Sequence, residues 1–513
     1  MDDISYVTTF LILIISVILI YLTWFYYESF QYWKRRGIPY IKPIIAPFGN
    51  TLKIYQGKAT FGEVFADAYL NLKKRGERHG GMYYLHSPFY IPVDPDIIKK
   101  IVISDAHYFA NHGMYINPED DILSGHLFNM EDKAWKVLRT QTPSIFTSSK
   151  MRNMYLTMQK MVDPFLMWLD KYAETQEPVD IKNVLTRFTT DIISACAFGI
   201  DTNTLKKENE DILYHSRKFF DYQWGLFRNT IVVAIPRHIL QAFKFRIFPK
   251  NTEKYVVDMF TNIYKYRKQN GVNRNDLMNT FMRLTEKNED LKDFTGKNRI
   301  EPLDMNQLSS HLFLFFCAGF ETSSSTQTFA LYELAKNPNC QTKLRNEINS
   351  VLAKHDNKMT YDAIMEMKYL EHCIDETLRI YPIFPIVLRR CREDYEILDT
   401  GYTIEKGTYV MVTNMGIQRD PEYYPNPLQF DPERWTYENS LNRPFVANLP
   451  FGEGPRICVG KRFGLLQSKL GIATLVKDYE VTLSDRTKKG FKFVSSELIL
   501  RKDGDVWLQL KKI

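Results

Sequence analysis

The sequence has 513 residues, of which 44% are hydrophobic and 14% aromatic, a composition typical of a folded protein with a large core and not of a disordered chain. Its net charge is +7, but the 67 basic residues are interspersed with 60 acidic ones and form no arginine-rich arm, so nucleic acid is not an expected partner. The six cysteines form no CxxC pair, which argues against a zinc site or a disulfide framework and indicates a reducing compartment.

An uncharged run near the N-terminus predicts a membrane anchor. The 24 residues from Ile4 to Tyr27 carry no charge. As a helix they would span about 36 Å, more than the roughly 30 Å of a hydrocarbon core. A cleaved signal peptide is the alternative, but two aspartates precede the run and aromatic residues end it. Basic residues at 34–36 follow, so we expect residues 1–30 to form a single-pass anchor with the rest of the chain in the cytosol.

Proline spacing marks the next segment, and helical periodicity dominates beyond it. Pro39, Pro43 and Pro47 are four residues apart, which favours a stiff extended segment. Residues 31–48 are therefore interpreted as a basic, proline-containing hinge before one catalytic domain at 49–513. Helices are predicted over residues 151–172, 180–198, 252–268, 306–336, 340–354 and 361–381. The predicted fold is mainly α with a small β portion, a single large helical domain behind the transmembrane helix.

Few segments show the alternation of a strand. They are residues 81–93, the segments around 389–412, and a C-terminal hairpin in which Asp503 and Gly504 separate residues 498–500 from 506–510. The apolar segment 230–243 has two interpretations, packing in the core, which we favour, and contact with the bilayer near the anchor. The charged stretch 285–299 is interpreted as a solvated loop.

The strongest chemical signal surrounds Cys458. The sequence F-G-E-G-P-R-I-C-V-G at residues 451–460 precedes a helical pattern. Cys458 is therefore expected to begin a helix, where free N–H groups and the helix dipole favour a thiolate, a strong ligand for iron. Gly454 and Gly460 can allow tight turns and close approach of a flat macrocycle, while Arg456 can meet a carboxylate and Phe451 can shield the sulfur. The alternative, a buried structural cysteine, would suit a cysteine without these neighbours.

This motif resembles the cysteine loop of the cytochrome P-450 superfamily of haem-thiolate monooxygenases, and the resemblance runs from the anchor to the C-terminal end. It implies haem b as cofactor, with the Cys458 thiolate as the metal ligand and O2 as co-substrate. The amino-acid sequence of residues 318–322 and 329–335 most resembles that of the insect microsomal group that metabolises foreign compounds such as insecticides and plant toxins.

A second segment interrupts an apolar helix with polar residues. Gly319 is expected to remove bulk where a ligand presses on the helix, and Thr322 can bond back to an upstream carbonyl. The resemblance implies that this segment covers the distal face of the haem, with Ala318 and Gly319 against the cofactor. It also implies that Glu321 and Thr322 are a catalytic pair that passes protons towards dioxygen. The alternative is that the hydroxyl groups of this segment only face neighbouring helices.

Two further motifs are expected to be structural. Glu376 and Arg379 are three residues apart and share a helix face, a spacing that on its own is most often a surface ion pair. The resemblance implies that Arg434, in the segment 430–435, docks onto this pair and that the three residues together brace the cysteine loop.

Cations are expected for the two haem carboxylates. Trp135 and Arg139, four residues apart, and Arg389 match family positions that hold the propionates, and Arg456 would complete the set. Arg390 stands beside Arg389 and is the alternative contact. For each of these cations, ordinary exposure to solvent is the competing interpretation.

The resemblance implies an endoplasmic-reticulum monooxygenase that inserts one oxygen atom of O2 into a small apolar substrate. Electrons would come from NADPH through a membrane reductase, with cytochrome b5 as a second partner. The absence of a G-x-G-x-x-G fingerprint from the sequence fits electrons that arrive through a partner. Four cations could meet an acidic reductase face or simply be solvated: Lys133, Lys136, Lys461 and Arg462.

The sequence leaves three competing functions open: an endogenous steroid or fatty-acid hydroxylase, a peroxide-rearranging haem enzyme, and a non-enzymatic haem sensor. The acid-alcohol pair argues against the peroxide enzyme, because members of that class often lack it. Family position gives these candidate pocket walls, for most of which core packing is an equal explanation: Phe219, Phe220, Phe313, Phe316, Phe384, Ile386, Val387, Phe493 and Val494. An aromatic pocket would suit flat, apolar ligands.

Overall fold

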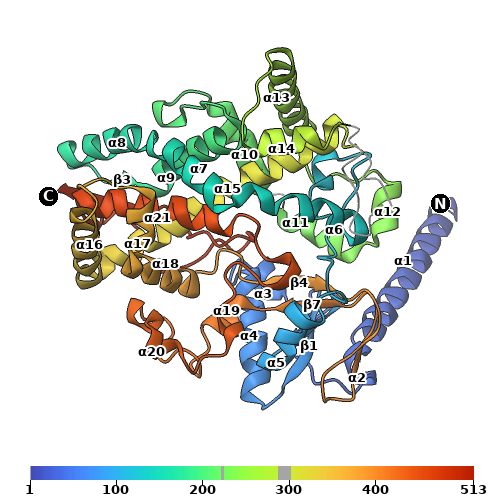
Figure 1. The fold of residues 1–513 in the computed structure, drawn as a ribbon. Coiled ribbons are helices and arrows are strands. Elements are labelled where there is room, and N and C mark those ends of the chain that lie inside the picture. Colours follow the sequence, from blue (N-terminus) through green and yellow to red (C-terminus); the bar gives the residue numbers. More distant parts are fainter. Residues whose placement is uncertain (1, 221–224, 287–301) are drawn as a thin grey trace.

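A computed structural model describes residues 2–220, 225–286 and 302–513, and this part of the chain is mainly helical, with a small β portion beside the helices (Figure 1). The helices of the first half are α1 (Asp2–Ser29), α2 (Tyr32–Arg35), α3 (Leu52–Tyr55), α4 (Phe61–Lys74), α5 (Pro95–Lys99), α6 (Asp132–Gln141), α7 (Ser148–Gln159), α8 (Val162–Thr175), α9 (Ile181–Ile193), α10 (Glu210–Phe220), α11 (Gly225–Ala234) and α12 (Arg237–Ala242). Those of the second half are α13 (Lys250–Gln269), α14 (Leu277–Arg283), α15 (Met305–Lys336), α16 (Pro338–Ala353), α17 (Tyr361–Glu366), α18 (Lys368–Ile380), α19 (Asn414–Gln418), α20 (Tyr437–Ser440) and α21 (Lys461–Asp478).

Short helical turns connect these elements. Two are π-helical, η1 (Lys100–Ser104) and η4 (Ser194–Phe198). The others are 3-10 turns: η2 (Ile122–Gly125), η3 (Pro143–Phe146), η5 (Thr204–Lys206), η6 (Pro432–Trp435), η7 (Phe445–Ala447) and η8 (Gly454–Arg456).

Three small sheets accompany the helices. The strands are β1 (His79–Tyr84), β2 (Ser87–Pro92), β3 (Val179–Asp180), β4 (Val387–Arg390), β5 (Tyr395–Glu396), β6 (Thr403–Ile404), β7 (Tyr409–Val412), β8 (Tyr479–Leu483) and β9 (Trp507–Lys512). The largest sheet has the order β1-β2-β7-β4, and the other two have the orders β3-β9-β8 and β5-β6. In the largest sheet β2 and β7 run parallel, whereas β1 with β2 and β4 with β7 are antiparallel.

Helix α15 runs through the main core and contacts α9, α13 and α21 (Figure 1). Asp304 caps its start: the Asp304 carboxylate accepts from the Gln307 N–H at 2.8 Å, and the Gln307 side chain accepts from the Asp304 N–H at 3.0 Å. Beyond the cap, α15 is buried along most of its length, as expected of a helix that is apolar on most sides. A second core lies between the largest sheet and helices α4 and α5.

The sequence predictions differ from the structure in two kinds of detail. The periodic stretches 151–172 and 361–381 are each two helices, which break at residues 160–161 and at Met367, because a break of one or two residues hardly disturbs the apolar periodicity. The prediction of a C-terminal hairpin is wrong. Strand β9 pairs with β8 and β3, and Gly504, at φ +81°, only turns the chain ahead of it. Most of the charged stretch 285–299 lies outside the described residues.

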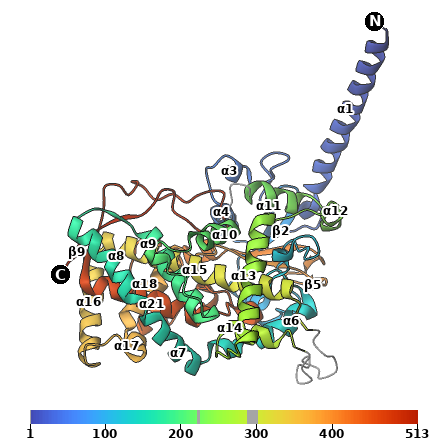
Figure 2. The ribbon, with the colours of Figure 1, turned by 90° about the horizontal axis from the view of Figure 1, so that it is seen from above.

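Helix α1 projects from the body on the side where α11 and α12 lie (Figure 2). Within its 24 residues from Tyr6 to Ser29, an 18-residue window has a mean hydropathy of 2.4 and no buried position, so by length and composition this helix can cross a membrane.

The segment after the anchor is packed against the body. Trp33 is buried and donates from Nε1 to the Met82 carbonyl at 3.0 Å. A Cβ on Gly81 would lie 2.3 Å from the Trp33 ring, so Gly81 allows this close approach. The division into residues 1–30, 31–48 and 49–513 stays a prediction, and the docked Trp33 places a firm attachment inside the expected hinge.

Candidate active site

The cysteine loop is a closed turn that ends just before α21. The Cys458 N–H donates to the Phe451 carbonyl at 2.9 Å, and Gly460 caps α21, which begins at Lys461. The prediction that Cys458 begins a helix is therefore wrong by three residues. Gly454 has φ +70°, and a Cβ there would lie 1.9 Å from the Val102 carbonyl oxygen. Gly454 thus serves contact between two backbone segments and not the approach of a macrocycle, whereas a Cβ on Gly460 would meet open space.

The pKa of the Cys458 thiol reflects two opposing effects. Burial among protein atoms raises this pKa, whereas a hydrogen bond with the Gly460 backbone and the charges of Arg139 and Lys461 lower it, and the net direction is upward. The backbone N–H thus favours the thiolate, as the sequence predicts, but this effect is smaller than that of desolvation. A metal ion at the sulfur favours the thiolate strongly enough to reverse this balance.

Cys458 and Ala318 both border internal space. Cys458 lies deep in the protein, yet its side chain is exposed, and Ala318 is exposed in α15 between the buried residues Cys317 and Phe320. A residue inside a core is accessible only where it lines a cavity. Gln467 of α21 donates from Nε2 to the Gly319 carbonyl, so α15 is fixed directly to the helix that follows the cysteine loop.

Within α15, five consecutive carbonyls, those of residues 318–322, accept from side chains. The Ala318 carbonyl accepts from the Thr322 hydroxyl (2.7 Å), and the Phe320 carbonyl accepts from that of Thr189 (3.0 Å). The Glu321 carbonyl accepts from the Ser324 hydroxyl (3.1 Å), and the Thr322 carbonyl accepts from that of Thr326 (2.9 Å). The Gly319 carbonyl accepts from Gln467. Such bonds loosen a helical ladder, as predicted for Thr322. The expectation for Gly319 is wrong: a Cβ there would lie 2.7 Å from Ile193 of α9, so Gly319 allows helix packing and does not make room for a ligand.

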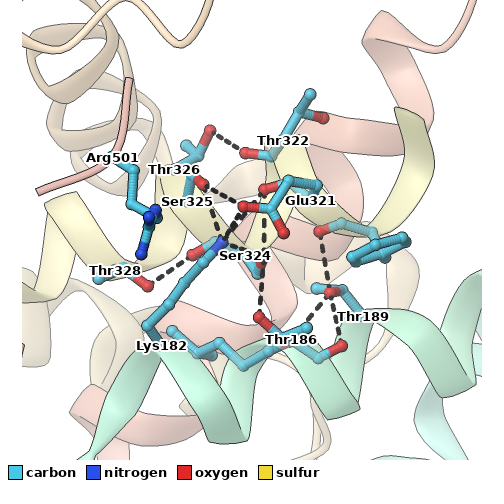
Figure 3. Close-up of polar contacts among 12 residues, drawn as sticks. Lys182, Thr186, Thr189, Glu321, Thr322, Ser324, Ser325, Thr326, Thr328 and Arg501 are labelled. Atoms are coloured by element: carbon cyan, nitrogen blue, oxygen red, sulfur yellow. Dashed lines mark hydrogen bonds and ion pairs between the residues drawn. The ribbon is translucent and has the colours of Figure 1, made fainter. Parts of the chain in front are cut away.

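The acid and the alcohol point in different directions (Figure 3). The Thr322 hydroxyl bonds to the Ala318 carbonyl, on the part of α15 that borders the internal space. The Glu321 carboxylate turns towards α9, where its Oε1 lies 2.8 Å from Lys182 Nζ. No hydrogen bond joins Glu321 to Thr322 in the described part of the chain. Lys182 was missed in the sequence because only the packing of α9 on α15 brings it near Glu321.

The side chains of Arg389 and Arg390 lie on opposite sides of strand β4. Residues of β4 alternate between buried and half-buried positions, so Arg389 faces inward, while Arg390 donates to the Gly407 carbonyl and lies over the Tyr409 ring. Burial lowers the pKa of Arg389 to about 10. Its guanidinium makes one hydrogen bond, 2.9 Å to the Leu388 carbonyl, and no carboxylate among the described residues pairs with it. Arg389, rather than Arg390, is therefore placed to receive an anion.

The other three expected contacts surround the cysteine loop. Arg456 lies 3.7 Å over the Trp135 ring and donates to the carbonyls of Ala110 (2.6 Å) and Met130 (2.8 Å). Arg139 donates to the Ile457 carbonyl at 2.8 Å. Arg139 thus ties α6 to the cysteine loop, and Arg456, which lies within the loop, ties it to the segment before α6.

His112 is a buried residue that belongs to none of the sequence motifs. Its Nδ1 lies 2.8 Å from the Phe128 carbonyl. Burial, followed by the charges of Arg389 and Arg456, holds the pKa of His112 well below its usual range. The buried Arg389 and the half-buried Arg456 therefore both act on the buried His112, and no carboxylate among the described residues contacts Arg389, an arrangement that fits an anionic ligand.

The predicted contacts of Glu376 with Arg379 and Arg434 are present in the structure. Glu376 and Arg379 are fully buried, and Arg379 donates from Nε and Nη2 to the two carboxylate oxygens, both at 2.8 Å. Arg434 Nε lies 3.3 Å from Glu376 Oε1, and Trp435 Nε1 donates to Glu376 Oε2 at 3.1 Å. Arg379 also donates to the carbonyls of the segment 418–429. This network ties α18 to η6, ahead of the cysteine loop.

Comparison with known proteins decides the family. The family model for cytochrome P450 matches residues 41–508. The chain belongs to the cytochrome P450 family. It is 35% identical to cytochrome P450 6a2 of Drosophila melanogaster over 99% of this chain and 100% of that protein. It is also 36% identical to cytochrome P450 6A1 of Musca domestica over 95% and 94% of the two chains.

The residues present fit the haem that this P450 family implies. Cys458 offers a thiol to internal space, Gly460 leaves room beside it, and Arg389 is a buried cation with unused donors. Arg389 and Arg456 border the same narrow gap between side chains, and both guanidinium groups would hold the carboxylate groups of the haem. Haem ligated by the thiolate supplies the activation of O2.

The residues that were expected to line a substrate pocket lie in different parts of the structure. Phe219 packs on Phe313 of α15 with ring centroids 5.5 Å apart, and Phe220 lies 6.3 Å from Phe320. Phe384 lies 6.4 Å from Phe128, a residue that is 39% exposed between buried neighbours and was missed in the sequence. Of the remaining walls, Phe316 is buried in the main core, Ile386 and Val387 in the second core, and Phe493 packs on Phe491.

Proposed function

We propose that this P450 is a microsomal monooxygenase that detoxifies small, flat, apolar compounds. One oxygen atom of O2 enters the substrate, the other becomes water, and NADPH supplies the two electrons through a membrane reductase. The observation that carries the proposal is the pairing of an accessible thiol at Cys458 with the loosened turn of α15 around Ala318. Turnover of a panel of foreign compounds, with reductase and NADPH, tests it directly.

The substrate class follows from the aromatic walls. Phe128, Phe219 and Phe384 offer ring faces and edges near α15, and such surfaces favour flat, apolar ligands. The resemblance of residues 318–322 and 329–335 to the insect microsomal group that metabolises foreign compounds supports such a role, and the similarity to P450s of two insects is consistent with it. An endogenous steroid or fatty-acid hydroxylase is the competing function, and preference for a fatty acid over aromatic compounds in the same panel would favour it.

A peroxide-rearranging enzyme and a haem sensor would each differ from a monooxygenase in their use of NADPH. The peroxide enzyme would convert a lipid peroxide without NADPH, and the sensor would bind small gases without consuming NADPH at all. The Thr322 hydroxyl beside the accessible Ala318 argues for O2 chemistry, since it places a proton donor and acceptor on the helix that borders the internal space.

The Thr322→Val variant tests the proposed proton delivery. Valine keeps the shape of threonine but removes the hydroxyl, so product formed per NADPH should fall by about tenfold and hydrogen peroxide should rise. NADPH consumed, peroxide released and product formed are measured with saturating reductase. Thr326→Val is the matched control, because its hydroxyl bonds to the Thr322 carbonyl in a buried position. Unchanged ratios in Thr322→Val with normal haem content would show that Thr322 only packs.

We propose the endoplasmic-reticulum membrane as the location, with the body on the cytosolic side because basic residues follow α1. The reductase, and cytochrome b5, would approach cations near the cysteine loop. Among these, Lys461 lies 5.6 Å over the Phe451 ring, whereas Arg462 donates to the Phe146 carbonyl and to Ser148. We therefore favour Lys461 over Arg462 as a contact for an acidic partner.

The segment 230–243 contains residues that fit core packing and residues that fit contact with the bilayer. Leu240 is buried, but Phe243 is 81% exposed and Ile239 is 38% exposed, and their helix α12 lies on the side from which α1 projects (Figure 2). We propose that Phe243 enters the membrane surface while Leu240 packs inward.

Deletion of residues 1–30 should weaken membrane association and leave haem binding intact, because the anchor is exposed and Trp33 retains the attachment of the following segment. Flotation with phosphatidylcholine vesicles measures the association, and the reduced carbon monoxide spectrum measures the haem. Phe243→Ser in the truncated protein should lower the residual flotation further. A truncated protein that is soluble but cannot incorporate haem would contradict the separation of anchor and body.

A further inference from the structure

Lys182 occupies an unfavourable place for a cation. It stands in the first turn of α9 (Ile181–Ile193), where the helix dipole disfavours positive charge, and its side chain is only 19% exposed. Burial lowers the pKa of Lys182, and the charge of Glu321 opposes that effect. A cation in such a place persists only with partners that compensate for both costs.

The partners of Lys182 all belong to the polar turn of α15. Its Nζ lies 2.8 Å from Glu321 Oε1, 2.7 Å from the Ser324 hydroxyl and 2.8 Å from the Ser325 hydroxyl (Figure 3). These three acceptors match the three N–H bonds of an ammonium group. Glu321 is the one carboxylate within ion-pair distance of Lys182 in the part of the chain that the structure describes.

A partly exposed ion pair lies on the same side of α15. Arg501 is drawn beside this cluster in Figure 3, pairs with Glu497 at 2.9 Å, and is 49% exposed. The charge of Glu321 acts on Arg501, and the charges of Arg501 and Glu497 act on Lys182. The Glu321 carboxylate therefore lies near this partly exposed pair.

We propose that Lys182 is a positioning residue for proton delivery, which holds the Glu321 carboxylate at the α9 side of α15 where protons arrive from solvent. The inference rests on the proposed role of Glu321 as the acid of the pair. Without Lys182 the carboxylate loses its cation and keeps only a long hydrogen bond from the Ser325 hydroxyl, at 3.4 Å, which holds its direction less firmly. The function of Glu321 then fails although Glu321 itself remains.

The kinetic test compares Lys182→Met, Lys182→Arg, Glu321→Gln and the double variant Lys182→Met with Glu321→Gln. The probe is ethoxycoumarin, and haem content is checked by the reduced carbon monoxide spectrum. Lys182→Met should lower kcat by about tenfold with KM unchanged, since Lys182 does not touch the aromatic walls. Lys182→Arg should restore most of kcat, because a guanidinium also binds a carboxylate. In the double variant, kcat should equal that of Glu321→Gln alone, because Lys182 acts through Glu321.

A second measurement does not depend on turnover. Reaction of lysines with an amine-acylating reagent, read by mass spectrometry, should be faster at Lys182 in Glu321→Gln than in the parent. Lys469, which is paired with Glu371 at 3.0 Å, is the internal control and should be unchanged. If Glu321→Gln turned over normally, the role of Glu321 would be wrong. If Glu321→Gln were slow but Lys182→Met were normal or additive with it, or if the reactivity of Lys182 did not change, the positioning role would be overturned.

Discussion

The Cys458→Ser variant is expected to lose the red-shifted Soret band that carbon monoxide gives with reduced, thiolate-ligated haem. The hydroxyl of serine does not ionise at neutral pH and cannot supply the anionic sulfur that pushes electron density onto iron. The spectrum of the reduced protein with carbon monoxide measures this loss, and monooxygenase turnover should vanish with it.

Cys317→Ser is the matched control, because this cysteine is buried in α15 and burial holds its thiol pKa well above the ordinary range. It should keep the red-shifted band. The assignment of the ligand would be wrong if Cys458→Ser retained the band while Cys317→Ser or Cys373→Ser lost it.

The Arg379→Met variant should be strongly destabilised. Methionine removes both bonds to Glu376 and the bonds to backbone carbonyls, and it leaves a fully buried carboxylate with Arg434 as its remaining cation. Breaking one side of a buried ion pair costs about 3–5 kcal/mol. The temperature at which the haem spectrum is lost should fall accordingly, and expression of the holoprotein should drop.

An exposed ion pair provides the comparison. Arg152 and Asp362 lie 2.6 Å apart with side chains 54% and 56% exposed, so Arg152→Met should lower the temperature at which the haem spectrum is lost only slightly. Equal stability of the two variants would show that the buried pair does not brace the fold.

Features that depend on chemistry within one segment could be predicted from the sequence. The cysteine loop, the polar turn of α15 and the fully buried Glu376 with Arg379 each carry residue types that a local motif or a helical period identifies. Helices with a sustained apolar face were found for the same reason, and their errors are breaks of one or two residues.

Features that depend on packing between segments could not be predicted in this way. Strand β9 pairs with β8 and not with the nearer residues 498–500. Gly319 packs against Ile193 of α9, and Lys182 contacts Glu321, which is 139 positions away in the sequence. In each case the deciding partner lies far away in the sequence and leaves no local pattern.

The most direct test of monooxygenation follows the oxygen atoms. Purified holoprotein and reductase are given NADPH and a flat apolar substrate, naphthalene, under isotopically labelled O2 in ordinary water, and the hydroxylated product is analysed by mass spectrometry. One labelled oxygen atom per product molecule, formed only with NADPH and lost in Cys458→Ser, is the expected result. Product without label, or NADPH consumption that never yields a product across the panel of foreign and endogenous compounds, would contradict the assignment of this P450 as a monooxygenase.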